Sequence, residues 1–336
     1  MDGFDLGIAA LLPVVGRSDS ERRLMINLVG PVWEGNQVWL ITAGGAIFAA
    51  WPMLYATSFS GLYLAMMLLL VVLILRPVGF KYRSKYDHTP WRNAWDAVLT
   101  SAGIVAPIVF GVAFANVILG LPFDVESSSM RALYHGSFWE LFTPFALFCG
   151  VLSLLMHITH GATLLAWRVV DPVASRARRL GIVSAILVAI LFALGGFWVA
   201  ALDGHVITST IDPNAASNPL NKTVALMEGA WLTNFSKWPW LWIGPILGIV
   251  GALATSLFLA LRRPITAFIT SATSIAGIIS TVGFAIFPFI LPSSANPSIG
   301  LTVWDSSSSQ LTLWVMLIAT AILMPIIISY TSYIYH

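Results

Sequence analysis

Residues 31–45 read PVWEGNQVWLITAGG, a segment in which polar and aromatic side chains stand at the start of a long apolar run. Glu34 contributes a carboxylate, Asn36 and Gln37 contribute amides, and two tryptophans flank them. Ionisable groups are rare in apolar runs of membrane-spanning length and usually have a function there. The segment therefore predicts the start of a membrane helix and makes Glu34 the first residue to explain.

The composition extends this reading to the whole chain. Of 336 residues, 58% are hydrophobic and 10% are charged, whereas an average soluble domain is about 25% charged. The chain is therefore a membrane protein. Its net charge of +2 is too small to indicate a nucleic-acid partner. Cys149 is the only cysteine, which excludes a disulfide framework and a cysteine-based metal site within the chain.

The spacing of apolar runs predicts an all-α bundle of nine transmembrane helices in a single integral membrane domain, residues 1–336. Long outer loops are expected at about 202–238 and 291–309. The first apolar run is short, so we expect a first helix truncated at its N-terminal half, in a natural protein that begins about 20 residues earlier. The runs cover residues 6–15, 35–51, 53–75, 96–119, 137–167, 178–201, 239–261, 265–290 and 310–335.

Basic residues set the orientation. Fourteen of the 17 Lys and Arg fall in alternate loops, and only Arg131, Lys222 and Lys237 lie on the other side. By the positive-inside rule the basic loops are cytoplasmic, so the N-terminus faces outward and the C-terminus inward. Between the first two spanning runs, Ser18 and Glu21 have capping-box spacing. They introduce an amphipathic segment, with one apolar side formed by Leu24, Met25, Leu28 and Val29, that is expected to lie in the interface plane.

Two acids lie at the start of the chain. Asp2 and Asp5 are spaced i and i+3, so in a helix both carboxyls point the same way. They could form a pair on a proton path, or they could lie at the outer end of the helix in contact with water. Spacing alone leaves both readings open.

Glu34 also has two readings. An acid at a helix start is commonly a solvated partner of the helix dipole. The alternative is a cytoplasmic proton entrance, which the polar side chains on the following turns favour. Trp39 lies about a turn inside the membrane boundary, where an indole can line a narrow pathway or fill a core.

His157 and His160 raise the question of metal or haem ligation. Two histidines on one helix cannot supply the opposed axial ligands of a haem, and no further ligand motif accompanies them. We interpret both as polar packing or protein contacts, and Glu140 as an interfacial acid near the outer end of the same helix.

Several long segments, in order along the whole chain, resemble subunit II of the cytochrome bd ubiquinol oxidase family. The segments are DGFD at 2–5, ERR at 21–23, WEGNQVWLITAGG at 33–45, FAAWP at 48–52, RPVGF at 76–80, ASNPLNK at 216–222, FPF at 287–289, PSS at 292–294, WD at 304–305 and SSQLTL at 308–313.

The resemblance implies a nine-helix subunit that pairs with a subunit I in the bacterial cytoplasmic (inner) membrane. That partner would carry the quinol site, two haems b and one haem d, and the resemblance assigns no cofactor to this chain, while a structural quinone or lipid here is left open. The complex would oxidise ubiquinol or menaquinol, reduce dioxygen to water and take its protons from the cytoplasm, which generates a proton gradient. Membrane lipids and quinone are further implied partners, and a small accessory subunit is left open.

By the same resemblance, Asp2, Asp5 and Glu34 fall where subunit II contributes to a proton path, and Trp39 where it lines a dioxygen path. Position 34 is Glu where the family pattern leads us to expect Asp, which keeps the titrating group and lengthens its reach. Two other classes remain. A secondary transporter would show inverted repeats and broken helices, and neither is clear in this sequence. A purely structural scaffold would leave Glu34 and Asp5 without a role.

Overall fold

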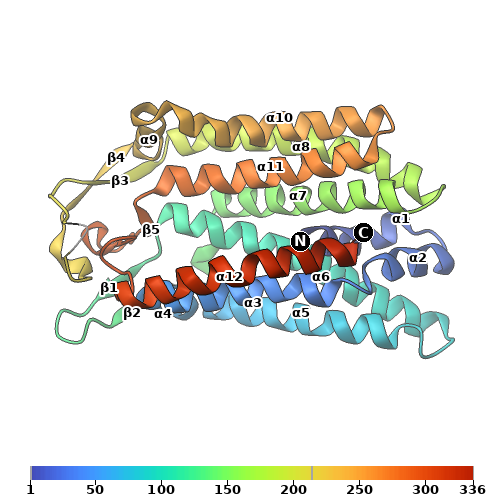
Figure 1. Ribbon diagram of the computed structural model, residues 1–336, viewed down its shortest axis with the longest axis horizontal. Coiled ribbons are helices and arrows are strands. Elements are labelled where there is room, and N and C mark those ends of the chain that lie inside the picture. Colours follow the sequence, from blue (N-terminus) through green and yellow to red (C-terminus); the bar gives the residue numbers. More distant parts are fainter. Residues whose placement is uncertain (1, 213–214, 336) are drawn as a thin grey trace.

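The computed structural model describes residues 2–212 and 215–335, and its long helices run along one common axis (Figure 1). Pro213 and Asn214 of the long outer loop, and the terminal Met1 and His336, lie outside the described residues. The helices are α1 (Asp2–Val15), α2 (Asp19–Val29), α3 (Trp33–Ala50), α4 (Pro52–Gly61), α5 (Tyr63–Tyr82), α6 (Thr89–Leu119), α7 (Pro144–Arg168), α8 (Val173–Ala200), α9 (Thr233–Lys237), α10 (Ile243–Ala260), α11 (Pro264–Ile286) and α12 (Gln310–Tyr335).

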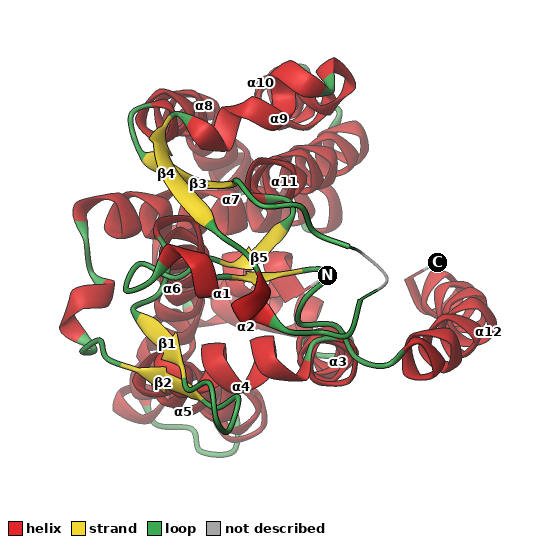
Figure 2. Ribbon diagram, turned by 90° about the vertical axis from the view of Figure 1, so that its left-hand side faces the viewer, coloured by secondary structure: helices red, strands yellow, loops and turns green. Residues whose placement is uncertain are grey.

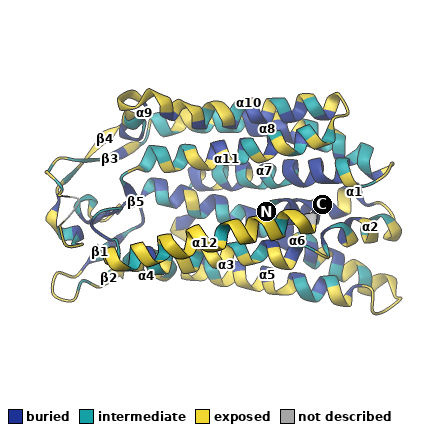
Figure 3. Cartoon of the chain, viewed as in Figure 1, coloured by how far each residue is buried: buried dark blue, intermediate teal, exposed yellow. Residues whose placement is uncertain are grey.

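Seven of the helices in this described part are long and apolar enough to cross a membrane, namely α5, α6, α7, α8, α10 with the turn before it, α11 and α12. Many of their large apolar residues are exposed (Figure 3). A helix that satisfies its own backbone hydrogen bonds and presents apolar side chains is what lipid accepts. The predicted helical membrane bundle is confirmed at this level. α1, with 14 residues, and α3, with 18, are not among the seven.

The third predicted helix, residues 53–75, differs from the structure. Its first part is a separate helix, α4, and the spanning helix α5 begins at Tyr63 and continues to Tyr82. A side chain at Gly61, the last residue of α4, would place its Cβ 2.7 Å from the ring of Tyr134. Glycine at this position lets the hairpin of residues 123–134 pack directly on α4. The apolar sequence is continuous here, so hydropathy alone did not reveal the break.

α1 lies at the centre of the bundle, against α6 and α7. Glycines make the contact possible: a Cβ at Gly7 would lie 1.9 Å from the carbonyl oxygen of His157, and one at Gly103 would lie 2.3 Å from the backbone nitrogen of Ala10. Small residues that allow backbones to touch are the usual means of helix association in lipid. α1 is therefore packed between α6 and α7 along its buried length.

α2 caps the end of the bundle that carries most of the basic residues. The predicted capping box at Ser18 and Glu21 is present. The buried side of α2 consists of Met25, Ile26 and Val29, while Leu24 is exposed, so the predicted apolar side was shifted by part of a turn. Arg176 of α8 donates to Glu21 at 2.5 Å, and this hydrogen bond lowers the pKa of the Glu21 carboxyl to about 2.

A second set of ion pairs fixes α2 to the segment that joins α5 and α6. The buried guanidinium of Arg83 pairs with Asp96 of α6 and with Asp19 of α2, the latter at 2.8 Å. Arg22 reaches Asp96 from the other side at 3.1 Å. Three separate segments therefore meet in one charged cluster at the end of the bundle where α2 lies.

Short strands gather at the opposite end (Figures 1 and 2). They form three antiparallel pairs. Lys222 and Asp305, from the two long loops at about 202–238 and 291–309, pair at 2.7 Å with both side chains buried. This ion pair ties the two loops into one cap. The strands are β1 (Phe123–Val125), β2 (Ala132–Tyr134), β3 (Asp203–Ile207), β4 (Val224–Glu228), β5 (Phe289–Leu291) and β6 (Leu301–Thr302).

α12 stands to one side of the bundle, next to α3 (Figure 2). Its main contact is with α3, and no part of its apolar stretch is buried in the described structure. α3 itself exposes Ile41 (70%) and Phe48 (60%). α3 and α12 together form an open apolar side of the molecule.

Candidate functional site

The Asp5 carboxylate lies in the first turn of α1 and is 1% exposed. The amide nitrogen Nδ2 of Asn36, on α3, donates to its Oδ2 at 2.8 Å. The other oxygen, Oδ1, is buried and has no hydrogen-bond partner among the described residues. The reading that placed Asp5 in contact with water is wrong, because α3, α6 and α7 enclose α1. A buried carboxyl with a free oxygen is the kind of intramembrane group that marks a proton path.

Asp2 has a different environment. Arg76, inside α5, donates to both of its carboxylate oxygens, at 2.7 and 3.0 Å. The Arg76 side chain is 0% exposed, and its guanidinium carbon lies 5.9 Å from the Trp33 ring centroid. A bidentate pair of this kind is strong and geometrically fixed. The i and i+3 spacing placed Asp2 and Asp5 on one side of α1, but their partners differ. Asp2 forms an ion pair with Arg76, whereas Asp5 accepts a hydrogen bond from the amide of Asn36.

The position of Arg76 differs from the one that the sequence predicted. The positive-inside count placed it in a cytoplasmic loop, whereas α5 continues past it to Tyr82 and buries it. A buried cation needs a counter-charge. Arg76 directly follows the apolar run 63–75. This position could have indicated that the arginine is buried and pairs with an acid on another helix.

Glu34 lies in the first turn of α3 and is exposed. Asn36 is two residues further along, which is about 200° around the helix, so the two side chains leave α3 on opposite sides. The structure therefore brings Asn36 together with Asp5 and places Glu34 on the open side of α3. Trp39 is half-buried on the same helix, between exposed Val38 and Leu40.

His157 and His160 both turn toward α1. Nδ1 of His157 lies 2.7 Å from the carbonyl oxygen of Ser153, and Nδ1 of His160 lies 2.7 Å from Oγ of Ser271. A carbonyl only accepts, so Nδ1 of His157 carries the hydrogen. The His160 ring stacks on Phe268 at 4.6 Å between centroids.

The two histidine rings lie close to the backbone of α1. A Cβ placed on Gly3 of α1 would lie 3.7 Å from the ring of His157 and 3.9 Å from that of His160. Within the described ranges, no group of three or more His, Cys, Asp or Glu could hold a metal ion.

Comparison with known proteins gives a consistent result. Residues 1–336 match the family described as cytochrome bd terminal oxidase subunit II. The chain is 50% identical over 335 residues to the cytochrome bd-I ubiquinol oxidase subunit 2 of Escherichia coli K12, which covers 99% of this chain and 88% of that protein. It is 49% identical over 334 residues to a probable cytochrome oxidase subunit 2 of Haemophilus influenzae, with the same coverage.

The fold is also found in a solved structure. A chain in the structure of bd oxidase from Geobacillus thermodenitrificans superposes with a TM-score of 0.69, covering 99% of this chain and 93% of that one. Its sequence identity is 16%, so this match bears on the fold alone.

Proposed function

This chain belongs to the cytochrome bd terminal oxidase subunit II family, and we propose that it assembles with a haem-bearing subunit I whose reaction it supplies with protons and dioxygen. The chain is an integral inner-membrane protein and a subunit of a quinol oxidase complex, not a secondary transporter. The reaction we propose for the complex is the oxidation of ubiquinol or menaquinol coupled to the reduction of dioxygen to water. The two haems b and the haem d belong to the partner in this proposal.

The observation that carries the proposed role is the buried pair of Asp5 and Asn36. This hydrogen bond joins Asp5, the more deeply buried of the two acids of α1, to α3. The opposite side of α3 is exposed. In this proposal Glu34 takes up a proton at the inner end of α3, and the Asp5 carboxyl holds it inside the bundle. Asn36 orients that carboxyl, and Arg76 keeps Asp2 as a fixed counter-charge. A purely structural scaffold would not need an acid with an unpartnered oxygen at this depth.

The open side of α3 and α12 is where we place subunit I. Ile41 and Phe48 on α3, and Leu311 and Ile326 on α12, are 60% to 75% exposed. A partner on this side would cover Glu34 and Trp39, so that Glu34 would face the interface and the Trp39 indole would line a route for dioxygen toward the partner.

The orientation belongs to the same proposal. α1 and α3 join the seven apolar helices to make nine membrane helices in a single integral membrane domain. The charged cluster around Arg83 and α2 lies at the cytoplasmic end, and the strand cap lies outside. The N-terminus is then outward and the C-terminus inward.

The test uses the purified two-subunit complex. We expect Glu34→Ala to slow quinol-linked oxygen consumption while the haem spectrum stays intact, and Glu34→Asp to have a mild effect because it keeps the carboxyl. Glu228→Ala, at an exposed acid of the strand cap, is the matched control and leaves turnover unchanged. Unchanged turnover in Glu34→Ala would remove the proton-entrance role. An affinity purification that yields no haem-bearing partner would remove the assembly itself.

A further inference from the structure

Four arginines at the end of the bundle where α2 lies have no acid as an ion-pair partner among the described residues. Arg178 and Arg179 stand in the second turn of α8, and Arg262 and Arg263 lie in the turn between α10 and α11. Arg178 is half-buried and the other three are exposed. These four residues form the basic patch.

Several arginines on neighbouring segments of the same end differ from the basic patch, because acids neutralise them. Arg83 lies between Asp19 and Asp96, and Arg176 pairs with Glu21. A guanidinium that already binds a carboxylate is less available to a second anion. The capacity for a further anion at this end is therefore concentrated in the basic patch.

An acid, Asp171, lies beside the basic patch in the turn between α7 and α8. Its carboxyl accepts hydrogen bonds from the backbone N–H of Ser175, at 2.9 Å, and from the Ser175 hydroxyl. The Ser175 hydroxyl lowers the pKa of Asp171 most, and the nearby charges of Arg178 and Arg262 lower it further. Asp171 therefore lies close to both halves of the patch. Four guanidiniums beside this carboxylate leave an excess of positive charge.

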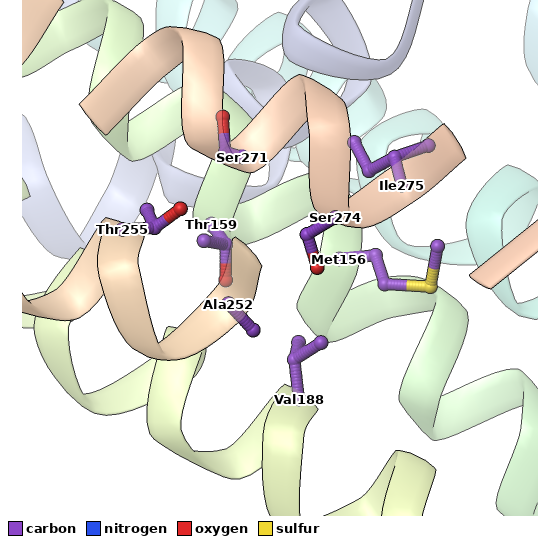
Figure 4. A pocket seen from close by; sticks show the side chains of 8 residues that line it. All are labelled: Met156, Thr159, Val188, Ala252, Thr255, Ser271, Ser274 and Ile275. Atoms are coloured by element: carbon purple, nitrogen blue, oxygen red, sulfur yellow. The ribbon is translucent and has the colours of Figure 1, made fainter. Parts of the chain in front are cut away.

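The two halves of the basic patch are adjacent because α8 and α10 run side by side (Figure 1). Near the patch, a Cβ at Gly181 of α8 would lie 2.8 Å from a methyl group of Leu259 on α10. Further along the same contact, the buried residues Val188 of α8 and Ala252 of α10 line one small cavity from opposite helices (Figure 4). Close packing of small side chains therefore holds the ends of α8 and α10 together.

An exposed apolar stripe leads from each half of the patch toward the middle of the bundle. On α8, Val183 and Leu187 follow Arg179 at intervals of four residues, and both are exposed. On α10, exposed Leu253 and Leu257 are also four residues apart and lead toward the turn that holds the other two arginines. Residues four apart lie on one side of a helix. Each helix thus presents apolar side chains beside a cationic end.

This combination of charge and apolar surface restricts the class of ligand. A planar guanidinium binds phosphate oxygens with two parallel hydrogen bonds, and basic groups between membrane helices bind anionic lipid headgroups. A soluble anion would use the arginines alone. A phospholipid would use the arginines and the apolar stripes together.

We propose that the basic patch binds the phosphate headgroup of an anionic phospholipid, whose acyl chains lie along the apolar stripes of α8 and α10. The site lies on other helices than Asp5 and Glu34. The proposal requires that the chain spans a membrane, and it does not depend on the proton and dioxygen roles.

The test uses the purified two-subunit complex, stripped of loosely bound lipid in detergent and then given phosphatidylglycerol or phosphatidylcholine. Native mass spectrometry counts the lipid molecules that stay bound. We expect the unaltered complex to retain phosphatidylglycerol in preference to phosphatidylcholine. Arg262→Gln with Arg263→Gln should weaken phosphatidylglycerol binding roughly tenfold, because basic residues supply the attraction to an anionic headgroup. Arg262→Lys with Arg263→Lys keeps the charge and should retain most of the binding.

Lys81→Gln with Lys85→Gln is the matched control, since it removes the same charge from two exposed cations at the same end of the bundle. It leaves phosphatidylglycerol binding unchanged, and the haem spectrum of every variant should stay intact. Equal losses in the two glutamine variants would indicate diffuse attraction and overturn the site, and so would equal retention of the two lipids. Bound inorganic phosphate, added in a parallel sample, without a preference for phosphatidylglycerol would identify a soluble-anion site and contradict the proposal.

Discussion

Asn36 of α3 donates from Nδ2 to Oδ2 of Asp5 on α1 at 2.8 Å, and the two residues are 2% and 1% exposed. Asn36→Leu would leave the buried Asp5 carboxyl without this donor. The loss of one partner of a buried polar pair costs about 1–3 kcal/mol, so we expect lower thermal stability of the purified complex and slower oxygen consumption. Ser101→Ala, at an exposed hydroxyl of α6, is the control and should change neither. A fully active Asn36→Leu complex would argue against the role of this pair.

Arg76→Met would remove the partner of Asp2 and leave an acid unpaired next to α5. Breaking a buried ion pair by removing one member costs roughly 3–5 kcal/mol, and we expect little assembled complex in membranes. The double variant Arg76→Met with Asp2→Asn should recover part of the yield, because no uncompensated charge remains. Arg23→Met, at an exposed arginine of α2, is the matched control. Equal yields for the single and double variants would show that the Arg76–Asp2 ion pair does not determine the amount of assembled complex.

Gly7→Ala should prevent α1 from seating against α7, because the added Cβ would overlap the carbonyl oxygen of His157. Backbone cannot move aside as a flexible side chain can, so we expect loss of folded protein, measured by size-exclusion chromatography of detergent extracts. Gly196→Ala is the control, since a Cβ there meets no atom within 4 Å. Normal recovery of Gly7→Ala would mean that α1 can shift by more than its packing suggests.

The strand cap should weaken as the pH falls. Burial lowers the pKa of His205, while the hydrogen bond to the Ser293 carbonyl partly opposes that shift. The unfolded cap binds the proton more readily, so the folded cap loses stability as the pH falls below about 6.5, the ordinary value for histidine. The protection factors of the β3 and β4 amides, which correct for the intrinsic pH dependence of exchange, should therefore be lower at pH 5.5 than at pH 7.5. His205→Gln should reduce this difference, and an equally large pH effect in that variant would assign it to other groups.

Local sequence rules predicted the order of the spanning helices and the capping box of α2. Apolar runs and cap residues act within a few positions along the chain, so their pattern is visible in the sequence. The close contact of Gly61, beside the break, is with Tyr134, which is more than 70 residues away. The sequence could show a glycine in an apolar run but not the ring that packs against it.

Contacts between residues far apart in the sequence also limited the prediction of the candidate site. The sequence drew attention to Asp5 and to the polar side chains from Glu34 to Thr42, but Asn36 was grouped with Glu34, whereas its hydrogen bond goes to α1. Arg76 and Lys222 were treated as loop charges, whereas each pairs with an acid more than 70 residues away in the chain. Charge pairing between helices depends on packing, which a single sequence does not display.

α12 has few contacts within the chain, and this affects what fixes its rotation about the helix axis. Residues 310–335 include no Asp, Glu, Lys or Arg, and apolar side chains cover the helix on all sides. Lipid tails solvate such a surface equally well at any rotation about the helix axis, and packing alone distinguishes one rotation from another. With α3 as its main neighbour, α12 takes its rotation, in the assembly proposed above, from the partner surface that covers it. In that assembly the rotation of this helix is a property of the membrane complex and not of the chain that contains it.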